Sequence, residues 1–240
     1  MGMSFYSLTQ IAVGIAVLLA GIYVFFKNKA SKLNRMSALT CFAAFLWLAP
    51  FGAAVTAVNA ETALAWFRTG AIGVIFMPVF IYHVSCISLN PQGKLFGKYV
   101  TAGYIAAFFS VFLSWSNFFF NGVYSYSWGF YPRAGIACSV FFIFAAFLCA
   151  KGFFTLILYM ARRFPKQYYT PKKYLQIKYL FPALFLTAMS LVSFISAYGS
   201  QTCYFAYAFM APGIAILAYS VITRQILEIR FLVKRVLVFT

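Results

Sequence analysis

The chain has 240 residues, of which 64% are hydrophobic and 9% are charged, and 19 Lys and Arg against two acidic residues give a net charge of +17. This number of charged residues is too small to cover the surface of a soluble domain. The composition therefore excludes an ordinary globular protein. The basic residues lie in short segments between apolar runs, where they report membrane topology rather than nucleic-acid binding.

Seven apolar runs follow one another along the chain, and each is long enough to cross a bilayer as a helix of about 20 residues. They cover residues 5–26, 36–58, 69–89, 99–120, 136–160, 179–198 and 204–223. The runs lack the alternating pattern of barrel strands, and a helix satisfies its own backbone hydrogen bonds in lipid. We therefore expect an all-α integral membrane protein, with a seven-helix bundle over residues 1–223.

The first run has no charged residue before it and is followed by Lys27, Lys29, Lys32 and Arg35. A cleavable signal peptide has its positive charge before the apolar core, so we expect this run to stay in the membrane. Across all seven runs, sixteen of the nineteen basic residues fall on one side. Arg68 and Arg133 fall on the other side, and Lys151 lies within the fifth run. The positive-inside rule then predicts an outer N-terminus and a cytoplasmic C-terminus.

Two ionisable side chains inside the runs are candidates for function, since such groups are costly in lipid. His83, in the third run, is the single histidine of the chain. Its alternative role is one interhelical hydrogen bond as a neutral imidazole. Lys151 has two interpretations: snorkelling to the inner headgroups, or binding the carboxylate or phosphate of a ligand.

The longest predicted outer loop, residues 121–135, concentrates Tyr, Trp, Phe, Gly and Pro beside the membrane. Such aromatic residues are ordinary interfacial anchors. The functional alternative is a lid over an outward-facing pocket, in which Trp128, Tyr131 and Arg133 contact a ligand.

Catalytic signatures are missing from the sequence: it contains no Gly-rich phosphate loop, GxSxG, HExxH or paired carboxylates. The single histidine and the five cysteines also lack metal-ligand spacing. We therefore expect no catalytic residue, no metal site and no cofactor, and hence no enzyme.

The segment 224–240 leaves the last run and remains compatible with a helix. Ile226, Ile229, Val233 and Val236 follow the spacing that begins a heptad seam. An amphipathic helix on the inner leaflet accounts for the same pattern. We predict that this segment is a cytoplasmic exit helix that transmits a signal.

Three stretches resemble the seven-helix N-terminal sensor region of bacterial histidine kinases. They are WGFYPRAG at 128–135, KKYLQIKYLF from Lys172, and PGIAILAYSVITRQILEIRFLVKRVL at 212–237. The resemblance implies a bacterial cytoplasmic membrane, a homodimer, and a cytoplasmic kinase or other output domain in the same chain or in a partner.

These patterns favour a membrane sensor that binds a small hydrophobic or amphipathic ligand and shifts its C-terminal helix. A small transporter or channel subunit is the alternative, which the sparse polarity inside the runs disfavours. A membrane-embedded enzyme is a third reading, which the missing catalytic groups disfavour.

Overall fold

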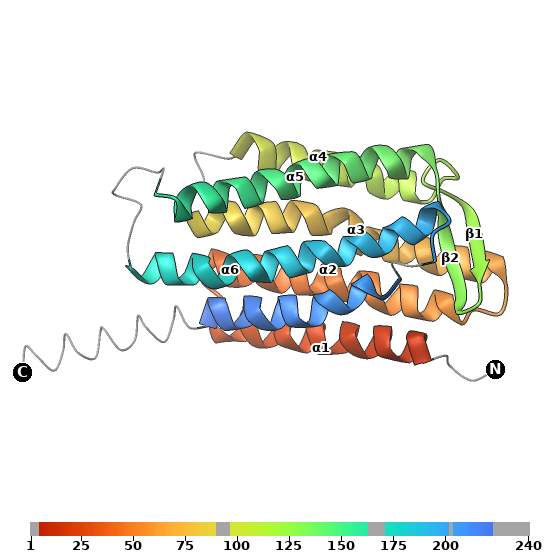
Figure 1. The fold of residues 1–240 in the computed structure, drawn as a ribbon, viewed down its shortest axis with the longest axis horizontal. Helices are drawn as coiled ribbons and strands as arrows, with labels where there is room; N and C mark the ends of the chain where they lie inside the picture. The colour runs from red at the N-terminus through yellow and green to blue at the C-terminus, as the bar shows by residue number, and fades with distance from the viewer. Residues whose placement is uncertain (1–4, 90–96, 163–170, 202–203, 223–240) are drawn as a thin grey trace, which may run out of the picture.

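The computed structural model describes residues 5–89, 97–162, 171–201 and 204–222, whose helices lie side by side along one long axis (Figure 1). A two-stranded antiparallel hairpin covers one end of this bundle. In chain order the elements are α1 (Phe5–Lys27), α2 (Lys32–Val55), α3 (Ala60–Leu89), α4 (Gly97–Ser114), β1 (Phe120–Tyr126), β2 (Gly129–Ala134), α5 (Ile136–Met160), α6 (Pro171–Met189) and the 3₁₀ helices η2 (Ser190–Tyr198) and η3 (Tyr204–Phe209). η3 forms the first turns of the last helix, Phe205–Ile222.

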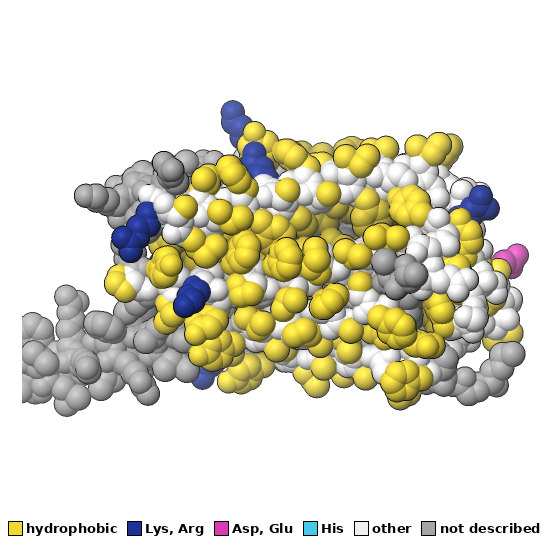
Figure 2. Space-filling model, viewed as in Figure 1, with side chains coloured by type: hydrophobic (Ala, Val, Ile, Leu, Met, Phe, Trp, Pro, Cys, Tyr) yellow, Lys and Arg dark blue, Asp and Glu magenta, His cyan; other side chains and the backbone are white. Residues whose placement is uncertain are grey.

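Successive helices run in opposite directions, and this gives the bundle two chemically different ends (Figure 1). The hairpin end carries β1, β2 and the turn between α2 and α3. The opposite end, here called the basic end, carries the α1–α2 turn and the starts of α4 and α6. On the face drawn in Figure 2, most blue side chains lie toward the basic end. The described Lys and Arg at that end are Lys27, Lys29, Lys32, Arg35, Lys98, Arg162, Lys173 and Lys178.

The central helix of the bundle is α3, which packs against α2, α4 and α5. A small residue permits its closest approach to α2, because a Cβ on Gly73 would lie 2.2 Å from the carbonyl oxygen of Ala43. Gly21 likewise permits the close approach of α1 to α2, since its added Cβ would lie 2.5 Å from the Cβ of Cys41. Glycines thus allow neighbouring helices to approach closely, as is common in membrane bundles.

Side-chain caps decide where two of the helices begin. The Ser31 side chain accepts a hydrogen bond from the backbone N–H of Asn34 at the start of α2. The Asn59 side chain accepts one from the N–H of Thr62, so α3 begins at Ala60, before the apolar run predicted from residue 69. The fourth run also differs from its prediction. Its helix ends at Ser114, because the chain turns before Phe120 and enters β1.

Six helices of the described chain are long and apolar enough to cross a membrane: α1, α2, α3, α5, the segment Lys173–Tyr198 that joins α6 to η2, and the last helix. α4 has 18 residues and is not one of the six. Large apolar side chains are exposed around the bundle, as the yellow surface in Figure 2 shows on one face. A soluble monomer rarely exposes so much apolar surface, so the fold indicates a multi-pass, all-α membrane protein.

Candidate functional site

The segment that the sequence predicted to be a loop forms the β1–β2 hairpin. Its strands pair Tyr124 with Tyr131 and Tyr126 with Gly129. Aromatic and β-branched residues favour the extended backbone. Gly129 closes the turn with φ 134°, a conformation that L side chains rarely adopt.

The tip of the hairpin lies directly on the end of α2. A Cβ added to Gly129 would lie 2.3 Å from the carbonyl oxygen of Val55, the last residue of α2. Only glycine combines this close contact with the positive φ. The position of the hairpin over the bundle is therefore set by backbone packing.

Tyr131 points from β2 into the bundle and is 2% exposed. Its ring lies 6.2 Å from Phe51, 5.9 Å from Phe67 and 6.3 Å from Phe194, measured between centroids, so rings from α2, α3 and η2 meet around it. We call Phe51, Phe67, Tyr131 and Phe194 the aromatic cluster. The Tyr131 hydroxyl donates a hydrogen bond of 3.0 Å to the carbonyl oxygen of Ser193. Burial raises the pKa of Tyr131 above its ordinary value, so the hydroxyl stays a donor at physiological pH.

Tyr126 makes a second hydrogen bond between the hairpin and η2. Its hydroxyl donates to the carbonyl oxygen of Ser196 at 2.8 Å. Its ring stacks on Tyr124 and lies 5.0 Å from the ring of Trp128. Burial also raises the pKa of Tyr126, with a further contribution from Tyr124. Two tyrosines of the hairpin therefore hold backbone carbonyls one 3₁₀ turn apart.

η2 is unusually long for a 3₁₀ helix, with nine residues where runs beyond three or four are uncommon. Serine recurs every third residue, at Ser190, Ser193 and Ser196, and all three are buried. This spacing places them on one face of a helix with three residues per turn. The Ser190 and Ser193 hydroxyls donate to the carbonyl oxygens three residues before them, and Gly199 ends η2 with φ 98°. Such local bonds compete with regular α-helical bonding.

The three predicted ligand-contact residues share the hairpin but have different surroundings. Trp128 is half-buried at the turn, with its ring 5.6 Å from that of Tyr131. Arg133 is exposed, and its guanidinium carbon lies 5.8 Å from the ring centroid of Tyr124. Tyr131 is enclosed by the aromatic cluster. Trp128 and Arg133 are thus accessible on the hairpin, and Tyr131 contacts both Trp128 and η2.

His83 and Lys151 lie away from the hairpin and contact tyrosines of α4. His83 Nδ1 is 2.8 Å from the hydroxyl oxygen of Tyr104, which is an interhelical hydrogen bond between α3 and α4. Lys151 Nζ lies 3.0 Å from the ring centroid of Tyr99. The structure therefore does not bring these two residues into the hairpin site.

The predicted transmission residues Ile226, Ile229, Val233 and Val236 lie outside the described residues. Within the described ranges, no group of three His, Cys, Asp or Glu is placed to hold a metal ion. The prediction of the site missed Tyr126 and its partner η2. The three-residue spacing of Ser190, Ser193 and Ser196 was the one signal for η2 in the sequence.

Comparison of the chain with models of known protein families gave no match, and comparison with curated protein sequences also gave none. The resemblance to histidine kinase sensor regions therefore rests on the sequence stretches alone.

Proposed function

We propose that this chain is the membrane-embedded sensory module of a bacterial signal-transduction system. The hairpin end receives a small hydrophobic or amphipathic ligand through Trp128 and Arg133. The signal leaves through the segment 224–240 to a cytoplasmic kinase or other output domain, in the same chain or in a partner. A homodimer would place two such segments side by side.

The observation that carries this proposal is the pair of hydrogen bonds from Tyr126 and Tyr131 to the backbone of η2. η2 continues α6, and α6 packs closely against the last helix at a glycine. A Cβ added to Gly213 of the last helix would lie 2.7 Å from Thr187 Oγ1 and 2.9 Å from Thr187 N on α6. A displacement of the hairpin therefore has a short mechanical route to the helix that leads to the C-terminal segment.

The length of the 3₁₀ segment supports a two-state mechanism, in which part of η2 converts to an α-helix. A 3₁₀ helix rises about 2.0 Å per residue and an α-helix about 1.5 Å, so converting one three-residue turn of η2 shortens it by roughly 1.5 Å. A ligand shifts this equilibrium only if it binds the two hairpin positions with different affinities. The carbonyls of Ser193 and Ser196 accept different hydrogen bonds in the two helix types, and the tyrosine hydroxyls favour one arrangement.

The proposal includes α4 as the seventh transmembrane helix. Its 18 residues extend about 27 Å, close to the hydrocarbon thickness of about 30 Å. Ile105, Phe108, Phe109 and Phe112 expose apolar surface along it. With seven spans, the positive-inside rule puts the basic end in the cytoplasm and the hairpin end outside.

Cysteine labelling tests this orientation. In a Cys-free background, Ser125→Cys in β1 should react with a membrane-impermeant maleimide on intact cells. Ala30→Cys, in the turn between α1 and α2, should react only after permeabilisation. Both native residues are exposed. Labelling of Ala30→Cys in intact cells would contradict the orientation.

Crosslinking tests the transmission. Single cysteines at Ile226, Ile229, Val233 and Val236 are oxidised in membranes with either the native hairpin or Tyr131→Phe. We expect a periodic crosslinking pattern whose intensities change in the Tyr131→Phe background. The matched control is Tyr23→Phe, which removes an exposed hydroxyl from α1. A pattern that Tyr131→Phe leaves unchanged would refute transmission from the hairpin.

A further inference from the structure

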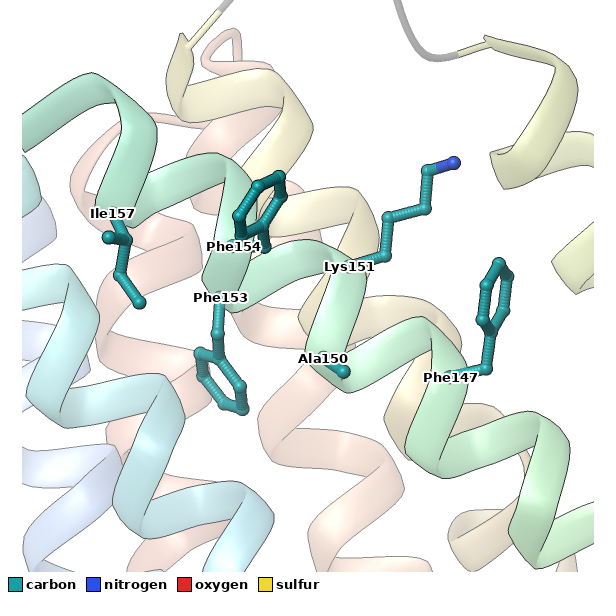
Figure 3. A pocket seen from close by; sticks show the side chains of 6 residues that line it. All are labelled: Phe147, Ala150, Lys151, Phe153, Phe154 and Ile157. Carbon is teal, nitrogen blue, oxygen red and sulfur yellow. The ribbon is translucent and has the colours of Figure 1, made fainter. Parts of the chain in front are cut away.

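A hollow of about 560 Å³ runs along the outer face of α5, away from the hairpin (Figure 3). Its lining side chains recur at intervals of one to three residues along the helix. Phe153 continues the apolar surface to α6, because its ring lies 5.9 Å from each of Phe181 and Phe185. The lining residues, here called the α5 groove, are Phe147, Ala150, Lys151, Phe153, Phe154 and Ile157.

Lys151 is the one charged residue in this lining. Figure 3 shows its side chain extended away from the axis of α5, on the same side as Phe147. Its Nζ lies over the Tyr99 ring and 5.7 Å from the Phe147 ring centroid. Its cation therefore lies against aromatic faces, which attract it but leave its charge uncompensated.

The chain offers little to neutralise Lys151. Of its two acidic residues, Glu61 lies in the first turn of α3 at the hairpin end, and Glu228 falls outside the described residues. In the part of the chain that the structure describes, Lys151 thus has no carboxylate partner. A cation in apolar surroundings is stabilised by an anion, and none of the described residues supplies one to Lys151.

The level of Lys151 along the bundle matches a lipid headgroup. Lys151 contacts Tyr99 in the first turn of α4, beside the exposed Lys98, and this turn is at the basic end. Toward the lipid, Phe147, Phe154 and Ile157 are all substantially exposed. A phosphate at Lys151 would neutralise its charge, and an acyl chain along these three side chains would cover the apolar lining of the groove.

We propose that the α5 groove binds an anionic phospholipid from the leaflet at the basic end, with Lys151 contacting its phosphate. The hollow is shallow and open on one side, which suits a lipid that remains in contact with the bilayer. A free phosphate would leave the apolar lining unfilled, and a neutral lipid would leave Lys151 without an anion. This site is independent of the sensory function, because none of its residues belongs to the hairpin or η2.

The test is native mass spectrometry of the full chain, purified in detergent and mixed with phosphatidylglycerol or phosphatidylcholine of the same acyl chains. We expect the wild-type protein to retain phosphatidylglycerol preferentially. Lys151→Gln should lower that preference about five-fold, as expected for one basic residue near an anionic surface. The matched control is Lys29→Gln, because Lys29 Nζ also lies over an aromatic ring, 4.5 Å from the centroid of Phe26, but outside the groove.

A second variant tests the shape of the α5 groove separately from the charge of Lys151. Ala150→Phe keeps Lys151 and fills the groove, so it should reduce the retention of phosphatidylglycerol as well. Equal retention of the two lipids by the wild-type protein would overturn the proposal. An equal loss in Lys29→Gln and Lys151→Gln would reduce the effect to general surface charge. Competition by inorganic phosphate together with full retention in Ala150→Phe would replace the lipid site with a simple anion site.

Discussion

Tyr131→Phe is the substitution that most sharply separates structural packing from the link between the hairpin and η2. It removes one oxygen atom and leaves the ring, so contacts with Phe51, Phe67 and Phe194 remain. What is lost is the 3.0 Å hydrogen bond to the carbonyl oxygen of Ser193, 62 residues away in the sequence. The site is buried, so water cannot easily replace the donor.

The expected loss of stability follows from that geometry. A buried hydrogen bond contributes about 1 kcal/mol net, and a carbonyl left without a partner raises the cost toward about 3 kcal/mol. The Ser193 carbonyl can still accept a local bond within η2, so we expect a loss of about 1–2 kcal/mol. For chains of this length 1 kcal/mol corresponds to roughly 2–4 °C, which predicts a fall in Tm of about 2–8 °C.

The native thiols provide the assay. Four free cysteines, Cys41, Cys86, Cys138 and Cys149, are buried in the helices. A fluorogenic maleimide in detergent solution will report their exposure as the bundle unfolds on heating. Tyr23→Phe is the control for the loss of an exposed hydroxyl and should leave Tm unchanged. An unchanged Tm for Tyr131→Phe would refute a stabilising bond between β2 and η2.

Two further substitutions test the packing of the helices. Gly73→Ala should lose about 1–3 kcal/mol, because its Cβ would lie 2.2 Å from the Ala43 carbonyl oxygen, whereas Gly97→Ala has open space and should be neutral by the same thermal assay. Equal effects of the two alanines would contradict the close approach of α2 and α3. A double-mutant cycle between His83→Phe and Tyr104→Phe should give a coupling of about 1 kcal/mol across α3 and α4, and additive effects would refute that bond.

The sequence predicted the helical segments well because long apolar runs have few alternatives in a membrane. The ends of the helices were predicted less well where local polar residues or turns determine where a helix begins or ends. Asn59 begins α3 before its apolar run starts, and the turn after Ser114 ends α4 before its run is complete. Both boundaries depend on backbone hydrogen bonding, which hydrophobicity alone does not report.

The prediction of the site identified the hairpin segment but not its connection. Trp128, Tyr131 and Arg133 stood out because aromatic residues were concentrated beside a basic residue. That the Tyr131 ring would turn inward depended on packing with helices distant in the sequence. Likewise, no local pattern links Tyr126 to Ser196, which lies 70 residues away. Tertiary contacts of this kind become evident only when the bundle is assembled.

The most direct test of the sensory account is a distance measurement between the basic ends of α6 and the last helix. Spin labels replace the exposed Tyr174 and Tyr219 in a Cys-free background, and pulsed electron resonance compares the native hairpin with a Tyr126→Phe, Tyr131→Phe double variant. The account predicts a shifted or second distance population in the variant. One identical distribution in both proteins would contradict the claim that the hairpin controls the last helix through η2.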